Sequence, residues 1–198
     1  MRRIPHAAAV LALALCAVLG LSTGPAVAAV TWSVSGGGAF SAPSTTSLVL
    51  INAGGTPVAQ CASSTATGSA PNGAGLSGSS LIGFTGFSFT GCTTSLGTTF
   101  TTSVGTLPLA FAGVSYSAAS GTTAGVVHGF VLVVQSTLCA ARFSGTLTGT
   151  YNNTSHNLAL SGSLTTSQVT GCLGLVSNGD LLSYTITYHF ATLHITSP

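Results

Sequence analysis

Few side chains in this protein are of the types that perform acid–base or nucleophilic chemistry. Its 198 residues include three Lys or Arg, five His and one acid, Asp180. Glycoside hydrolysis in its common form needs two carboxylates. A Ser-His-Asp triad would have to use Asp180, and no Gly-x-Ser-x-Gly nucleophile elbow stands between a strand and a helix. We therefore expect a protein that is not an enzyme and assign no catalytic residue.

Histidine is the other residue type here that could do chemistry, as a metal ligand. The histidines beyond the N-terminal leader are His128, His156, His189 and His194. A metal site needs ligands that converge from one face. His189 and His194 are five positions apart, so a regular strand would place them on opposite faces unless a β-bulge near residues 191–192 reunites them. We predict no metal site and no cofactor, and an unchanged melting temperature after EDTA treatment.

The cysteines predict disulfide bonds. Five are present, and one of them, Cys16, lies in the apolar leader. The others are Cys61, Cys92, Cys139 and Cys172. An even number of cysteines in an exported protein indicates disulfides, with three alternative connectivities for four cysteines. Two similar Ser/Thr/Gly-rich segments begin at Cys61 and Cys139 and close with Thr-Gly-Cys, and this weak repeat favours the pairs Cys61–Cys92 and Cys139–Cys172.

The N-terminus has the features of a secretory signal peptide. Arg2 and Arg3 precede an apolar run over residues 7–21, and Ala-Val-Ala at 26–28 is a small-x-small cleavage site. We predict a signal peptide over residues 1–28, and a lipid anchor on Cys16 is the alternative. The protein is then secreted, either extracellular or associated with the cell surface.

Removal of the leader leaves a β domain over residues 29–198 that begins at Ala29 or Val30 and has one base, Arg142, and one acid, Asp180. We expect no nucleic-acid partner, because a single arginine cannot neutralise a run of phosphates. If Cys139 and Cys172 are bonded, both charges lie in one neighbourhood and we predict an ion pair. Two separate surface charges are the alternative.

Short runs of apolar residues alternating with Ser and Thr indicate half-buried strands. The clearest run covers residues 182–190, and residues 143–151 and 158–164 form a hairpin. Residues 126–134 are typical of a strand buried on both faces. Further strands are expected at 31–35, 47–52, 81–90, 98–104 and 107–117. The prediction is all-β: a single-domain antiparallel sandwich or barrel of about nine or ten strands after an N-terminal signal-peptide helix. Two similar halves, 30–110 and 111–198, would explain the repeat.

Several short motifs resemble those of a known family. They are GCLGLVSNGD at 171–180, Leu107-Pro108, Ser115-Tyr116-Ser117, Gly121-Thr122-Thr123 and the closing Ile195-Thr196-Ser197-Pro198. On these motifs the chain resembles a functionally uncharacterised family of small secreted β-rich actinobacterial proteins. The resemblance implies export and β structure, and it implies no activity. Where the family often has Trp after Leu-Pro, this chain has Leu109.

These observations favour a non-catalytic secreted or cell-surface structural or interaction protein. Candidate partners are a cell-wall polymer or a second copy of the chain. One alternative is a β-barrel pore inserted in the cell envelope, although few runs reach the ~9–11 residues that membrane strands need. Another is a small barrel that binds an apolar ligand. Tyr184, Tyr188 and Phe190 share one face of the strand at 182–190, and we interpret them as core rather than as a binding strip.

Overall fold

The computed structural model describes residues 31–197, so the predicted signal peptide lies outside the described residues. Within this range the chain is built from strands and one short 3-10 turn, η1 (Cys172–Gly174). The strands are β1 (Trp32–Ser35), β2 (Gly38–Pro43), β3 (Leu48–Ile51), β4 (Pro57–Ala70), β5 (Gly73–Leu76), β6 (Ile82–Thr94), β7 (Thr101–Val104), β8 (Leu109–Ser117), β9 (Thr122–Gln135), β10 (Cys139–Asn152), β11 (Asn157–Gly171), β12 (Leu181–His189) and β13 (His194–Thr196). The all-β prediction is confirmed.

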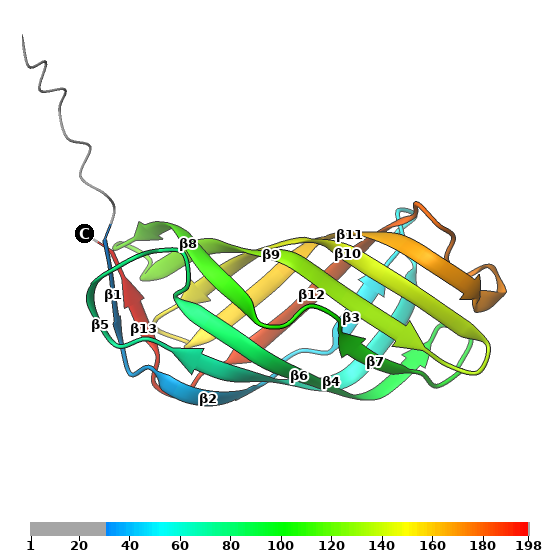
Figure 1. The fold of residues 1–198 in the computed structure, drawn as a ribbon, viewed down its shortest axis with the longest axis horizontal. Helices are drawn as coiled ribbons and strands as arrows, with labels where there is room; N and C mark the ends of the chain where they lie inside the picture. Colours follow the sequence, from blue (N-terminus) through cyan, green and yellow to red (C-terminus); the bar gives the residue numbers. More distant parts are fainter. Residues whose placement is uncertain (1–30, 198) are drawn as a thin grey trace, which may run out of the picture.

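The large sheet closes on itself into an elongated barrel (Figure 1). Its strands follow the order β10-β11-β12-β3-β4-β6-β8-β9, and β9 pairs with β10 to complete the ring, every pairing being antiparallel. The short strands β2 and β3 both pair with β4, each along a different part of it. In the same way, β7 and β8 pair with different parts of β9. Of the two architectures expected from the sequence, the chain therefore adopts the barrel. Because β8 runs across residues 110 and 111, the boundary expected between two halves falls inside a strand.

A second, three-stranded sheet in the order β13-β1-β5 covers one end of the barrel (Figure 1). We call it the lid. Trp32 on β1 is 2% exposed and packs so closely that a Cβ on Gly113 of β8 would lie 2.7 Å from its ring. Asn153, in the β10–β11 turn, accepts a hydrogen bond from the Ile195 amide and donates one to the Ile195 carbonyl, both at 2.8 Å. The lid is thus fastened to the barrel by packing and by hydrogen bonds.

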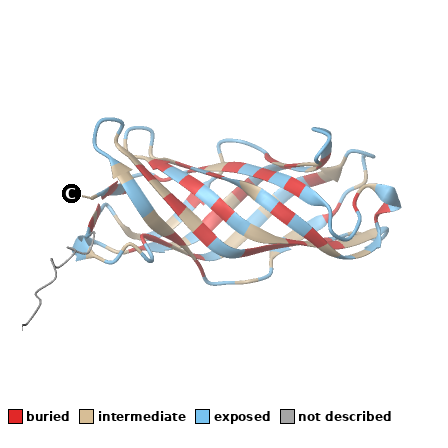
Figure 2. Ribbon diagram, turned by 90° about the horizontal axis from the view of Figure 1, so that it is seen from above, coloured by how far each residue is buried: buried red, intermediate tan, exposed pale blue. Residues whose placement is uncertain are grey.

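Side chains alternate between the barrel interior and the surface, which gives the ribbon its chequered burial pattern (Figure 2). On β12, Tyr184 is buried, whereas Ser183 and Thr185 on either side of it are exposed. The interior is filled with aromatic rings: the centroids of Phe130 and Tyr184, for example, lie 5.0 Å apart. The aromatic residues of β12 therefore belong to the core.

Some predicted elements differ from the observed ones. β4 was not expected, and β4, β6, β9, β10 and β11 have 13 to 15 residues, longer than the apolar runs suggested. Beyond the apolar runs, Ser, Thr and Gly residues continue the backbone hydrogen bonding between neighbouring strands. On β9, Val126 and Val133 are only partly buried, so the strand is not buried along both faces. Residues 191–192 form no bulge, because they connect the barrel strand β12 to the lid strand β13.

Among residues 31–197, no helix is both long enough and apolar enough to span a membrane.

Two neighbouring tyrosines in the core give a matched pair of variants. The hydroxyl of Tyr188 is hydrogen-bonded to Ser64 at 2.9 Å, whereas the buried hydroxyl of Tyr184 has no hydrogen-bond partner. A buried polar group without a partner costs about 1–3 kcal/mol. We expect Tyr184→Phe to raise the free energy of unfolding by about 1 kcal/mol and Tyr188→Phe to lower it by a similar amount. Urea denaturation measures both, and destabilisation by Tyr184→Phe would show that its hydroxyl is satisfied.

Candidate functional site

The end of the barrel opposite the lid is formed by four turns, and we call it the loop end (Figure 1). The turns connect β3 to β4, β6 to β7, β9 to β10 and β11 to β12. They are held side by side by direct contacts. The Ser95 amide donates to the Val58 carbonyl at 3.1 Å, and the Cys172 amide donates to the Leu138 carbonyl at 2.8 Å.

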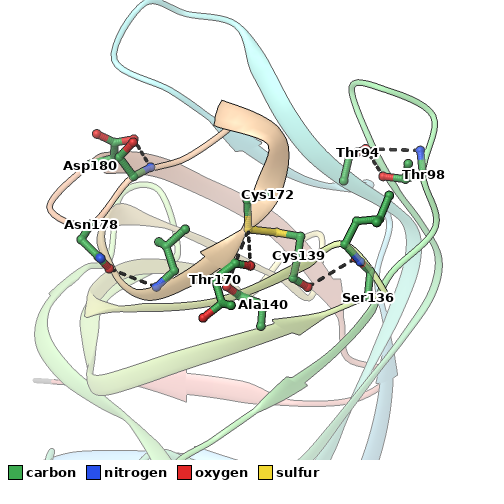
Figure 3. Close-up of a disulfide and its surroundings, with 12 residues drawn as sticks. Thr94, Thr98, Ser136, Cys139, Ala140, Thr170, Cys172, Asn178 and Asp180 are labelled. Atoms are coloured by element: carbon green, nitrogen blue, oxygen red, sulfur yellow. Dashed lines mark hydrogen bonds between the residues drawn. A yellow bond between two sulfur atoms is a disulfide. The ribbon is translucent and has the colours of Figure 1, made fainter.

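Both disulfides lie near this end, in the pairing that the internal repeat favoured. Cys61 and Cys92 face each other on β4 and β6, with their Cα atoms 3.9 Å apart. Cys139, the first residue of β10, is bonded to Cys172, directly after β11, with a Cα separation of 4.1 Å (Figure 3). Each disulfide therefore joins neighbouring antiparallel strands close to where they enter the turns.

The residues around Cys172 form a left-handed turn. Gly171, Cys172, Leu173 and Gly174 have φ values of 74°, 68°, 49° and 76°. Glycine adopts such angles freely, whereas another residue loses about 1–2 kcal/mol in this conformation. A side chain at Gly171 would also place its Cβ 2.3 Å from the Leu138 carbonyl oxygen. Glycine is thus required at 171, and Cys172 and Leu173 are held in a conformation that they disfavour.

Leucine side chains project into solvent from the loop end. They are Leu96, Leu138, Leu173 and Leu181, exposed by 56%, 53%, 65% and 55%. Leu96 lies in the β6–β7 turn, Leu138 in the β9–β10 turn and Leu173 in η1, while Leu181 begins β12. Sequence analysis missed them, because a leucine in a turn carries no periodicity that distinguishes exposure from burial. The sequence gives one hint of exposure, which is the position of Leu173 between a cysteine and a glycine in a turn-rich segment.

The predicted ion pair between Arg142 and Asp180 is not formed: among residues 31–197 no salt bridge or side-chain hydrogen bond joins the two residues. The Asp180 carboxylate instead accepts a hydrogen bond from the Ser177 amide at 2.7 Å and closes its own turn (Figure 3). Arg142 alternates on β10 with the buried Ala141 and Phe143, so its side chain is directed outward. The expectation of a shared neighbourhood was sound for the backbone, because Arg142 pairs with Ser167 and the neighbouring Thr166 amide donates to the Asp180 carbonyl.

This arrangement predicts independent effects of the two charges. Asp180→Ala removes a charge-assisted hydrogen bond and should lower the free energy of unfolding by about 1–2 kcal/mol. Arg142→Ala should change it by less than about 0.5 kcal/mol. In the double variant the two effects should add within about 0.5 kcal/mol. Urea denaturation of the four proteins in this cycle tests the expectation, and a coupling above 1 kcal/mol would contradict it.

Three of the histidines gather at the lid end. The ring centroids of His156 and His194 are 4.9 Å apart, and those of His156 and His189 are 6.5 Å apart. His189 and His194 do not share one regular strand, because His189 ends β12 and His194 begins β13, in different sheets. Within the described residues, no three His, Cys, Asp or Glu side chains form a group that could hold a metal ion. His128 is exposed on β9, 3.5 Å from the Thr146 hydroxyl.

No family model matches the chain, and neither a curated protein nor a solved structure is significantly similar to it. The resemblance to secreted actinobacterial proteins therefore remains an expectation.

Proposed function

We propose that the protein is a non-catalytic secreted or cell-surface protein with a structural or interaction role. The observation that carries the proposal is the division of side chains across the barrel wall. Aromatic and aliphatic side chains fill the interior, while Ser and Thr dominate the outward positions of long strands such as β10, β11 and β12. A rigid, hydroxyl-rich and almost uncharged surface suits hydrogen bonding to a neutral polymer of the cell wall, or to further copies of the protein.

The two disulfides support a location outside the cell. Disulfides persist in oxidising extracellular environments and are rare in the reducing cytosol. They also hold together a chain that has few charged groups for ion pairs.

The interior geometry disfavours the two alternative functions. A small-molecule site is usually a cavity of ~300–1,000 Å³. Here the ring centroid of Phe87 lies 5.2 Å from that of Phe84 and 5.9 Å from that of Tyr188, so aromatic side chains fill the barrel interior. A hollow of about 220 Å³ near the lid, lined by Phe40, Phe190 and Leu193 among others, opens to solvent. A membrane barrel carries an apolar outer band around a polar interior, the reverse of the division seen here.

Cell fractionation combined with a pull-down tests the proposal. We expect the mature protein in the culture medium or in a wall fraction. Its intact mass should match a chain that begins at Ala29 or Val30 and contains two disulfides. Purified protein should co-sediment with isolated cell walls or should self-associate. Ion conductance across planar lipid bilayers would favour the pore and overturn the proposal, as would hydrolytic activity on wall polymers.

A further inference from the structure

Four of the six large hydrophobic side chains that are exposed within residues 31–197 lie at the loop end. The exposed leucines at positions 96, 138, 173 and 181 are carried by three turns and by the first residue of β12. We propose that the loop end docks the protein on a lipid surface by inserting these leucines among the acyl chains, with the barrel standing away from the surface. This inference deepens the proposed function and rests on it, because it assigns a partner to an extracellular interaction protein.

The backbone at Leu173 is the second, independent observation. A leucine that is 65% exposed is held at φ 49° and ψ 31°, in a left-handed turn where glycine would be free of strain. Strained residues persist when the surrounding structure enforces them, and they gather at functional sites. The Cys139–Cys172 disulfide and the hydrogen bond from the Cys172 amide to the Leu138 carbonyl enforce this one. The fold thus keeps an apolar side chain exposed to solvent at a cost in stability.

The shape of the loop end favours a lipid phase over a second copy of the chain. Four half-exposed leucines offer an apolar area on the order of a few hundred Å². A stable protein interface buries about 800 Å² on each partner and requires a complementary surface. Leucines on separate turns would leave gaps against a rigid partner, whereas acyl chains flow around each of them.

The charged side chains of the protein determine which lipid surface is suitable. Arg142 and Asp180 are the charged side chains between residues 31 and 197, and the Asp180 carboxylate is already hydrogen-bonded within its turn. Attraction to anionic lipids needs clusters of Lys or Arg, which this part of the chain lacks. Docking should therefore be driven by apolar burial, with little dependence on salt or on lipid charge.

Vesicle flotation with the mature, disulfide-bonded protein tests the proposal. We expect it to bind phosphatidylcholine vesicles equally well at low and high salt, and no better when phosphatidylglycerol is added. Leu173→Gly should weaken binding about tenfold, and Leu138→Ser combined with Leu173→Gly about a hundredfold, since burial of each leucine is worth roughly a factor of ten. Val114→Ser is the matched control, because Val114 is also 65% exposed but lies on β8, near the lid. It should change binding less than about twofold.

The Leu173→Gly variant separates docking from folding. It relieves the left-handed strain and should raise the melting temperature, so that weaker binding cannot result from unfolding. Absence of wild-type binding, equal loss in Val114→Ser, or strict dependence on anionic lipid would each overturn the proposal. A dimer that dissociates in the leucine variants would assign the loop end to a second copy and overturn it as well. If the protein binds isolated cell walls but not vesicles, the lipid inference fails and the proposed function stands.

Discussion

The free energy of unfolding should be nearly constant between about pH 7 and pH 9 and should fall steeply above about pH 10. We expect a loss of at least about 3 kcal/mol between pH 10 and pH 12. The cause is the set of tyrosines enclosed by the barrel and its lid. Burial raises the pKa of Tyr188 from 10.0 to about 12 and holds the pKa values of Tyr184 and Tyr151 well above 10.0.

The free energy of unfolding falls as the pH rises because the folded state favours the protonated form of these tyrosines. A group whose folded pKa is raised contributes its full stabilisation below the unfolded pKa, near 10, and loses it as the pH rises through the folded pKa. One pKa unit corresponds to about 1.4 kcal/mol, so Tyr188 alone accounts for about 3 kcal/mol between its unfolded and folded pKa values. Tyr184 and Tyr151 add to this loss.

Urea denaturation across the alkaline range measures the effect, and the ultraviolet absorbance of tyrosinate reports when each group ionises. Tyr184→Phe serves as the control, because it removes one of the buried groups and should make the decline above about pH 10 shallower. A stability that stays level to pH 12 would show that these hydroxyls are accessible to water.

The predicted strands were those whose inward side chains are large. On β12, Leu182, Tyr184, Ile186 and Tyr188 alternate with polar residues and produce an unambiguous period of two. Over residues 64–70, β4 has the same period, and it escaped prediction because inward positions such as Ser64, Ala66 and Gly68 are small. At Gly68 the reason is close packing between strands: a Cβ there would lie 1.9 Å from the Gly83 carbonyl oxygen on β6 and 2.9 Å from the Phe40 ring on β2. The partner that explains a small residue lies far away in the sequence, and a local pattern cannot contain it.

The loop end was harder to predict than the barrel wall. Whether Leu173 is exposed depends on how the β11–β12 turn leaves the barrel, and that path is set by the contact of Cys172 with Leu138, more than thirty residues earlier in the chain. The same limit applies to Asp180, whose carboxylate found a closer partner in the Ser177 amide than in Arg142. The disulfide pairing was predictable because the two cysteine-bounded segments resemble each other, which is information that the sequence does contain.

Removal of the Cys61–Cys92 disulfide should lower the free energy of unfolding by about 4 kcal/mol. The bond closes a separation of 31 residues, for which the chain-entropy model predicts a stabilisation of about 3.5–4 kcal/mol. Cys61 is also fully buried in the barrel wall, so Cys61→Ala combined with Cys92→Ala loses some packing as well. Urea denaturation of the double variant measures the loss, and a change below about 1 kcal/mol would contradict the prediction.

The Cys139–Cys172 disulfide provides the matched comparison. Its separation of 33 residues gives nearly the same entropic term, yet its removal also frees Cys172 and Leu173 to leave their left-handed conformation. That release should return about 1–2 kcal/mol for each residue that relaxes. We therefore expect Cys139→Ala combined with Cys172→Ala to cost about 2 kcal/mol, roughly half the loss at Cys61 and Cys92. Introducing Leu173→Gly into both double variants completes the test. The glycine should stabilise the variant that keeps the Cys139–Cys172 bond more than the variant that lacks it, because only an enforced turn holds strain that glycine can remove.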